Sequence, residues 1–172
     1  MKEHQTKPQY SNISIVKMTK NLEFRGRTKH HVMCHIQDIP ENGADILHFR
    51  YVHQEIIPKI SWLAFDWKAK WKKGDDPELK EMFEHEKDYV REFKQEIYRD
   101  FVEPFKQKEY LSVAYLDNYL NFPFGIKCFM FNATIIQYGP TTVFIFLRSP
   151  LYKVAFQQFI QPQDRSHQLI YH

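Results

Sequence analysis

The sequence predicts an α+β domain in which a long amphipathic helix covers a curved antiparallel β-sheet. Residues 76–104 have apolar side chains mostly three or four positions apart, which is typical of a helix with one buried face. Residues 110–160 contain four β-rich runs, and the connections between the last three, at Gly139-Pro140 and Ser149-Pro150, are too short for helical crossovers. With 172 residues and 43% apolar content, the chain has the size of one domain with its own core.

The first third of the chain predicts short elements. Residues 1–12 are polar, and we expect them to be flexible. Three β-rich runs follow, and the last of them ends at the breaker Pro40. These expected strands are residues 13–16, 22–24 and 30–37. Residues 41–53 then have helical spacing.

A connection rich in Trp and Lys spans residues 58–77. Its indoles belong to Trp62, Trp67 and Trp71. We interpret it as a loop that docks these rings on the domain, in preference to an amphipathic patch that touches a membrane surface or a partner subunit.

The predicted helix begins where Asp76 can act as a cap and Pro77 can occupy the first turn, and it ends before Pro104. The side chains expected to be buried on it are Leu79, Met82, Phe83, Val90, Phe93, Ile97 and Phe101. The strands expected after it are residues 110–116, 126–138, 141–148 and 152–160.

Composition excludes several classes of function. The formal charge of +3 comes from interspersed basic and acidic residues, so nucleic-acid binding is not expected. The two cysteines, Cys34 and Cys128, form no C-x-x-C pair, so a disulfide framework and a cysteine zinc site are not expected. We interpret both as small buried side chains of a protein in a reducing compartment. No apolar run reaches membrane-spanning length and the first residues are not signal-like, so this chain is expected to be soluble and cytoplasmic.

The residue types that suggest chemistry gather between Glu41 and His53. On a helix, Glu41, Asp45 and His48 share one face. His53 lies about 140° further round, so both imidazoles reach one metal only if the helix ends, bends or bulges between them. Two imidazoles and one carboxylate form the triad of non-haem Fe(II) oxygenases. The alternative is a helix end whose histidines are solvated or bonded to neighbouring carboxylates.

The pattern Glu-Asn-x-x-Asp-x-x-His-x-x-x-x-His over residues 41–53 resembles the iron-binding motif of Rieske-type non-haem iron oxygenase α-subunits. With its flank from His35, it resembles the corresponding stretch of Neverland-type cholesterol 7-desaturases, and the segment at residues 62–67 fits as well. This resemblance implies a helix-grip-like catalytic domain, of which residues 1–172 are a part.

The resemblance also implies roles for individual residues. His48 and His53 would be iron ligands, and Asp45 would carry electrons and protons between two metal centres. Glu41 would lie close to these ligands. The third ligand of the family is an Asp in a helical segment after the last strands, and we expect this chain to end before it. Asp164, the only acidic residue after Asp117, is the remaining candidate, but it lacks the surroundings that the family's ligand has.

The partners implied by the resemblance are a sterol, an NAD(P)H-dependent reductase and two further copies in a homotrimer. The family's 2Fe–2S cluster needs C-x-H and C-x-x-H pairs, which this chain does not contain. The cluster is therefore expected on an N-terminal segment outside this chain, and association of the full-length protein with the endoplasmic reticulum membrane is expected through such a segment. We expect this chain to be a fragment that is inactive alone.

Four phenylalanines are candidates for lining a sterol site. Phe129 and Phe131, and likewise Phe144 and Phe146, alternate along neighbouring strands, so each pair is expected to face one side of the sheet. Core packing explains them equally well. Other histidines, His30, His31 and His35, are interpreted as ordinary polar residues or as neighbours of the site.

The leading interpretation is an Fe(II)- and O2-dependent sterol desaturase or oxygenase, with cholesterol 7-desaturation in steroid hormone synthesis implied by the resemblance. A non-enzymatic lipid- or sterol-binding module of the same fold is the alternative, and convergence of His48 and His53 on one point beside the cavity would distinguish the two. A zinc hydrolase would need a third ligand and a general base at closer spacing, and neither is evident.

Overall fold

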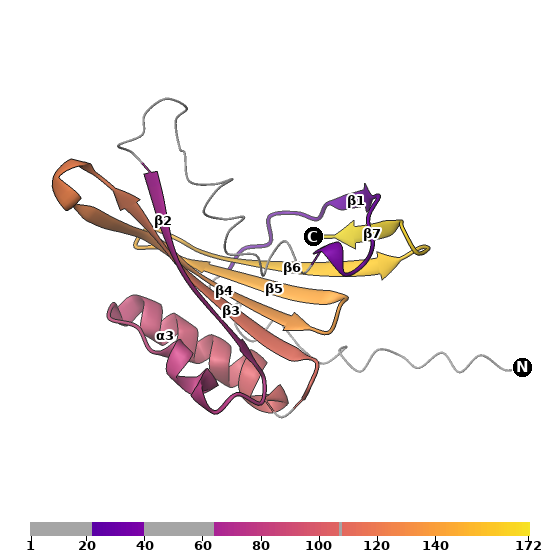
Figure 1. The fold of residues 1–172 in the computed structure, drawn as a ribbon, viewed down its shortest axis with the longest axis horizontal. Coiled ribbons are helices and arrows are strands. Elements are labelled where there is room, and N and C mark those ends of the chain that lie inside the picture. Colours follow the sequence, from indigo (N-terminus) through magenta and orange to yellow (C-terminus); the bar gives the residue numbers. More distant parts are fainter. Residues whose placement is uncertain (1–21, 40–63, 107) are drawn as a thin grey trace, which may run out of the picture.

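A computed structural model describes residues 22–39, 64–106 and 108–172. These residues form a seven-stranded antiparallel sheet in the order β1-β7-β6-β5-β4-β3-β2, with the helical segments on one face (Figure 1). The strands are β1 Lys29–Val32, β2 Ala64–Lys73, β3 Leu111–Asn121, β4 Lys127–Tyr138, β5 Thr142–Arg148, β6 Lys153–Pro162 and β7 Gln168–Tyr171. The predicted antiparallel meander, and with it the α+β class, is confirmed.

The helical layer covers the sheet as expected, but it is not one continuous helix. A 3-10 turn at Pro77–Phe83 is followed by an extended stretch, the helix α3 at Asp88–Ile97, a π-helical turn at Tyr98–Val102 and a 3-10 turn at Glu103–Phe105. The predicted cap is confirmed, because the Asp76 carboxylate accepts a 2.8 Å hydrogen bond from the backbone N–H of Glu78.

All seven apolar residues predicted for the helix face are buried. All of them except Val90 belong to one cluster with the side chains that strands β3, β4 and β5 direct toward the helices, and Phe101, Phe144 and Phe146 are in mutual ring contact. The Tyr138 hydroxyl donates a hydrogen bond to the carbonyl of Phe101, which ties the end of β4 to the helical layer. The main core therefore lies between the helices and the sheet.

The Trp- and Lys-rich segment is an edge strand, and its interpretation as a covering loop is wrong for residues 64–73. Strand β2 pairs with β3 from Ala64 opposite Asn121 to Lys73 opposite Ser112. Its aromatic residues Phe65, Trp67 and Trp71 alternate with Asp and Lys residues, and this period of two is the strand signal that the interpretation overlooked. Lysines along the edge also discourage pairing with another chain.

The two ends of the described chain meet at the opposite edge. Strand β1 is shorter than the expected 30–37 and pairs antiparallel with β7, which the sequence did not predict. Residues 22–24 form no strand. The expected strand at 13–16 and the helical spacing of 41–53 lie outside the described residues. None of the helices in the described ranges is long and apolar enough to cross a membrane.

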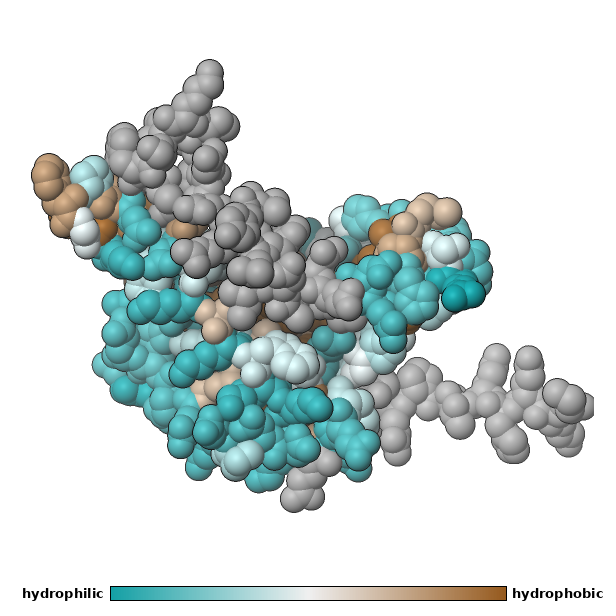
Figure 2. All heavy atoms as spheres, in the orientation of Figure 1, coloured by the Kyte–Doolittle hydropathy of each residue, from teal (hydrophilic) through white to brown (hydrophobic). Residues whose placement is uncertain are grey.

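The β3–β4 hairpin projects beyond the rest of the sheet (Figure 1). Its end exposes apolar side chains, visible as a brown patch in Figure 2, and Phe124 there is fully exposed. Phe124 also has a positive φ of 65°, a conformation that bulky residues rarely adopt.

Candidate functional site

The residues of the predicted iron motif, Glu41, Asp45, His48 and His53, lie outside the described residues. Their convergence on one metal therefore stays a prediction. Within the described ranges, no three His, Cys, Asp or Glu side chains gather in an arrangement that could hold a metal ion.

Asp164, the candidate third ligand, lies in the exposed turn between β6 and β7. Its Oδ1 accepts a 2.9 Å hydrogen bond from the backbone N–H of Ser166, so the carboxylate stabilises this turn. The same turn contains His167, whose Nε2 lies 3.1 Å from Nδ1 of His31 in β1. His30, the neighbouring residue in β1, packs against His172 instead.

The four candidate phenylalanines do not form two matched pairs. Phe144 and Phe146 are 1% exposed and share the helix face of β5, so that pair is as expected. A β-bulge in β4 separates Phe129 from Phe131. The consecutive β3 residues Asn118 and Tyr119 pair with Phe131 and Phe129, so Met130 of β4 has no partner in β3. Phe131 therefore packs on the face away from the helices, whereas Phe129 contacts His85 on the helix side. The extra residue reverses the alternation that the prediction assumed.

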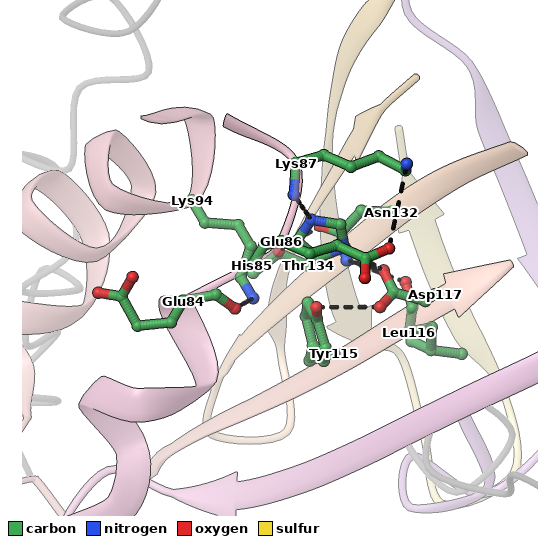
Figure 3. Close-up of polar contacts among 10 residues, drawn as sticks. All are labelled: Glu84, His85, Glu86, Lys87, Lys94, Tyr115, Leu116, Asp117, Asn132 and Thr134. Carbon is green, nitrogen blue, oxygen red and sulfur yellow. Dashed lines mark hydrogen bonds and ion pairs between the residues drawn. The ribbon is translucent and has the colours of Figure 1, made fainter. Parts of the chain in front are cut away.

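A buried polar cluster lies where the helical layer crosses the sheet (Figure 3). The carboxylate of Asp117 in β3 is its centre. Oδ1 accepts a 3.0 Å hydrogen bond from Asn132 Nδ2 and lies 3.3 Å from His85 Nε2, while Oδ2 accepts a 3.1 Å hydrogen bond from the Tyr115 hydroxyl. Burial raises the pKa of this carboxyl, but the hydrogen bonds from His85, Asn132 and Tyr115 outweigh burial and hold the pKa below its usual value.

His85 has both ring nitrogens occupied. Nδ1 accepts a 3.0 Å hydrogen bond from the backbone N–H of Lys87, and Nε2 faces Asp117. This geometry corresponds to the neutral tautomer with its proton on Nε2. Because neither nitrogen is left for a substrate, His85 is suited to a structural role and not to general base catalysis.

Lys94 of α3 is fully buried beside this cluster. Its ammonium nitrogen donates a 3.1 Å hydrogen bond to the carbonyl of Glu84 and lies 3.5 Å from the centroid of the Tyr115 ring. Burial lowers the pKa of Lys94 to about 7, although the charges of Asp117 and Glu84 oppose the shift.

The cluster explains why the predicted helix is interrupted. Residues 84–87 leave helical geometry so that the His85 side chain reaches Asp117 and the Glu84 carbonyl reaches Lys94. The sequence does contain a signal for this, since the apolar spacing stops at Phe83 and resumes only at Val90. The inward polar residues of β3 and β4 were not predicted.

The chain resembles curated proteins of one kind. It is 27% identical over 166 residues to the protein named cholesterol 7-desaturase nvd 1 of Ciona intestinalis, a match that covers 96% of this chain and 30% of that protein. Shorter matches, each covering 30% of this chain, reach 48% identity with the cholesterol 7-desaturase of Caenorhabditis elegans and 50% with cholesterol 7-desaturase nvd of Xenopus laevis, over 12% and 14% of those proteins.

No family model and no solved structure matches the chain. The chain spans about 30% of the length of its Ciona relative. The similarity extends well beyond the motif, because the Ciona match covers nearly all of this chain. The predicted resemblance is confirmed, and this chain is related by sequence to the Neverland-type cholesterol 7-desaturases.

Proposed function

We propose that this chain is part of the mononuclear-iron catalytic domain of a sterol 7-desaturase, an oxidoreductase that acts on cholesterol with Fe(II) and dioxygen. The observation that carries this proposal is the similarity to cholesterol 7-desaturases over 96% of the chain. The antiparallel sheet covered by a helical layer is compatible with the helix-grip-like domain that the resemblance implies.

The donor set of residues 41–53 fits a mononuclear Fe(II) centre. Imidazoles of His48 and His53 with one carboxylate provide the nitrogen and oxygen ligands that such centres use, and Asp164 is the carboxylate to test as the third ligand. Bound iron would supply dioxygen activation. Asp45 would accept a hydrogen bond from one ligand histidine, which fixes the tautomer of that ring, and Glu41 would lie beside it.

This chain's cysteines do not fit a 2Fe–2S cluster. Cys34 and Cys128 are free thiols without the neighbouring histidine pairs that the cluster needs. Cys34 is half-buried and Cys128 is exposed, so the expectation that both are buried is wrong. The cluster, an NAD(P)H-dependent reductase, a homotrimer and contact with the endoplasmic reticulum membrane are therefore proposed for a longer polypeptide that includes this chain.

The test is product formation by such a polypeptide, of the length that the relatives have. We expect 7-dehydrocholesterol from cholesterol in the presence of iron, dioxygen, NAD(P)H and a reductase. His48→Ala should remove the mononuclear iron and the product, whereas the iron of the 2Fe–2S cluster should stay. His31→Ala is the matched control, because it removes an imidazole that is bonded to His167, and it should keep both. Equal iron content and turnover in His48→Ala would contradict the proposal.

A further inference from the structure

Asn118 is a buried amide on the face of the sheet that points away from the helices. It lies in β3 opposite Trp67 of β2 and Phe131 of β4, and its side chain is 0% exposed. Its neighbours on that face are apolar. They form a cluster of Ala114, Leu116 and Ala133 packed by Trp67, Ala69, Phe131, Ile135 and Leu147.

The amide of Asn118 makes no hydrogen bond in the described structure. Among the residues that the structure describes, neither Nδ2 nor Oδ1 of Asn118 has a partner. Burying an amide without partners is costly, and such groups are few in native proteins. Asn132, a buried asparagine on the helix face, shows the usual solution, since its amide bonds to Asp117, the Leu116 carbonyl and Thr134.

The surroundings of Asn118 indicate what its partner is. Aromatic rings flank it, with the centroids of Trp67 and Phe131 5.8 Å apart and those of Phe65 and Trp67 6.0 Å apart. A mostly apolar lining with one well-placed polar group is the usual composition of a site for a small apolar ligand. The side chains of Lys68, Lys70 and Lys72 do not share this face, because they alternate with Trp67 and Trp71 along β2. Lys73 does share it, but it pairs with Ser112 at the far end of β2 from Asn118. A charged ligand beside Asn118 would therefore lack a nearby counter-charge from β2.

We propose that Asn118 is the polar anchor for the hydroxyl group of a sterol bound on this face of the sheet. A carboxamide offers one donor group and one acceptor, and a hydroxyl both donates and accepts, so the two groups can satisfy each other. The sterol's remaining surface is hydrocarbon and matches the aromatic neighbours. This inference rests on the proposed function for the class of ligand, and it assigns a residue that positions the substrate.

The experiment compares Asn118→Leu with the wild-type chain in two measurements. The first is binding of cholesterol and of the same hydrocarbon skeleton without its hydroxyl, by displacement of a fluorescent sterol. The wild-type chain should prefer cholesterol about tenfold or more, because the analogue leaves the amide unpaired. Asn118→Leu should bind the two ligands within about twofold of each other, since the leucine cannot distinguish them.

The second measurement is stability without sterol, which separates binding from folding. Replacing an unpartnered amide by an apolar group of similar shape is neutral or stabilising, so Asn118→Leu should unfold at the same or a higher urea concentration. Asn132→Leu is the matched control and should unfold at a lower concentration, because it breaks three hydrogen bonds.

Two outcomes of these binding and stability measurements would overturn the inference. One is clear destabilisation or misfolding of Asn118→Leu, which would show that another part of the chain holds the amide. The other is an unchanged preference for cholesterol in the variant. The longer polypeptide separates this inference from the proposed function. If it turns over cholesterol and Asn118→Leu leaves KM unchanged, the anchor is rejected while the proposed function stands. Hydroxyl-dependent binding without turnover would reject desaturation and keep the anchor.

Discussion

Asp117 and Asn118 are neighbours in β3, and their side chains face opposite sides of the sheet. The side chain of Asp117 is hydrogen-bonded, and that of Asn118 is not. The Asp117 carboxylate is surrounded by His85, Asn132 and Tyr115 on the helix side, whereas the Asn118 amide has no partner among the described residues. The strand thus carries a fully satisfied polar group that supports the fold beside an unsatisfied one that can serve a ligand.

Asp117→Asn should lower the free energy of unfolding by about 2–3 kcal/mol, because the amide cannot accept all the hydrogen bonds that the carboxylate accepts. Urea denaturation at pH 7 measures this loss. Asp66→Asn is the control, since Asp66 pairs with Lys127 near the surface and such pairs contribute less than about 1 kcal/mol. In the folded chain the pKa of the Asp117 carboxyl lies below 3.8, its value in the unfolded chain. The stabilisation that this carboxylate gives the fold is therefore present above pH 3.8 and is lost as the pH falls through the folded pKa. Equal effects of the two substitutions would contradict the structural role.

Lys94 should make the chain more stable as the pH rises from about 7 toward 10.5. Its folded pKa is about 7, so in this range the unfolded chain keeps a proton that the folded chain has released. Between pH 7 and pH 9 the wild-type chain should gain about 2 kcal/mol relative to Lys94→Met, whose side chain does not titrate. Lys80→Met, at an exposed position, should follow the wild type. Parallel pH profiles of wild type and Lys94→Met would show that Lys94 stays charged when folded.

Phe146 tests whether the helix-face phenylalanines are core residues or line a sterol site. Phe146 is 1% exposed and contacts Phe93, Phe101 and Phe144, so Phe146→Ala should cost roughly 3–5 kcal/mol through the cavity that it creates. Phe156→Ala, at a half-exposed position in β6, should cost about 1 kcal/mol or less. A small loss of stability together with weaker sterol binding in Phe146→Ala would favour the sterol site.

The isolated chain should bind Fe(II) weakly, because two imidazoles without a third protein ligand leave the iron site incomplete. Anaerobic titration with Fe(II) measures this affinity. A His31→Ala/His167→Ala background removes the histidine pair at the β1–β7 edge as a competing site. Tight one-to-one binding that is lost in His48→Ala would reveal a third ligand, with Asp164 the first residue to substitute.

In the longer polypeptide, Asp45→Asn should keep the fold and most of the iron but sharply slow product formation. The residue is proposed to contact a ligand histidine without binding the metal, so it affects electron and proton transfer more than affinity. Iron content and 7-dehydrocholesterol formation should be measured on the same preparation. Near-normal turnover would reject the bridging role of Asp45, while His48 and His53 could still hold iron.

The sequence by itself determined the features that depend on local pattern. The apolar spacing of residues 79–101 predicted the buried helix face, the breaker pairs at Gly139 and Ser149 predicted the meander, and Asp76 was identified as a cap. The motif at residues 41–53 identified the relatives, although the geometry of its side chains stays a prediction. These features need only neighbours in sequence, which a linear pattern records.

Only the tertiary structure decided the features that depend on distant partners. Strand β2 forms because β3, some fifty residues later, offers it an edge, and β1 forms because β7 returns to it at the other end of the chain. The bulge at Met130 separates Phe129 from Phe131, and His85 leaves the helix to reach Asp117 across the interface. Asn118 is an ordinary strand residue in the sequence, and its amide is unpaired only because the neighbouring strands bring apolar aromatic side chains to its face. Pairing between strands and burial of polar groups depend on contacts between residues far apart in the chain, so the sequence pattern does not record them.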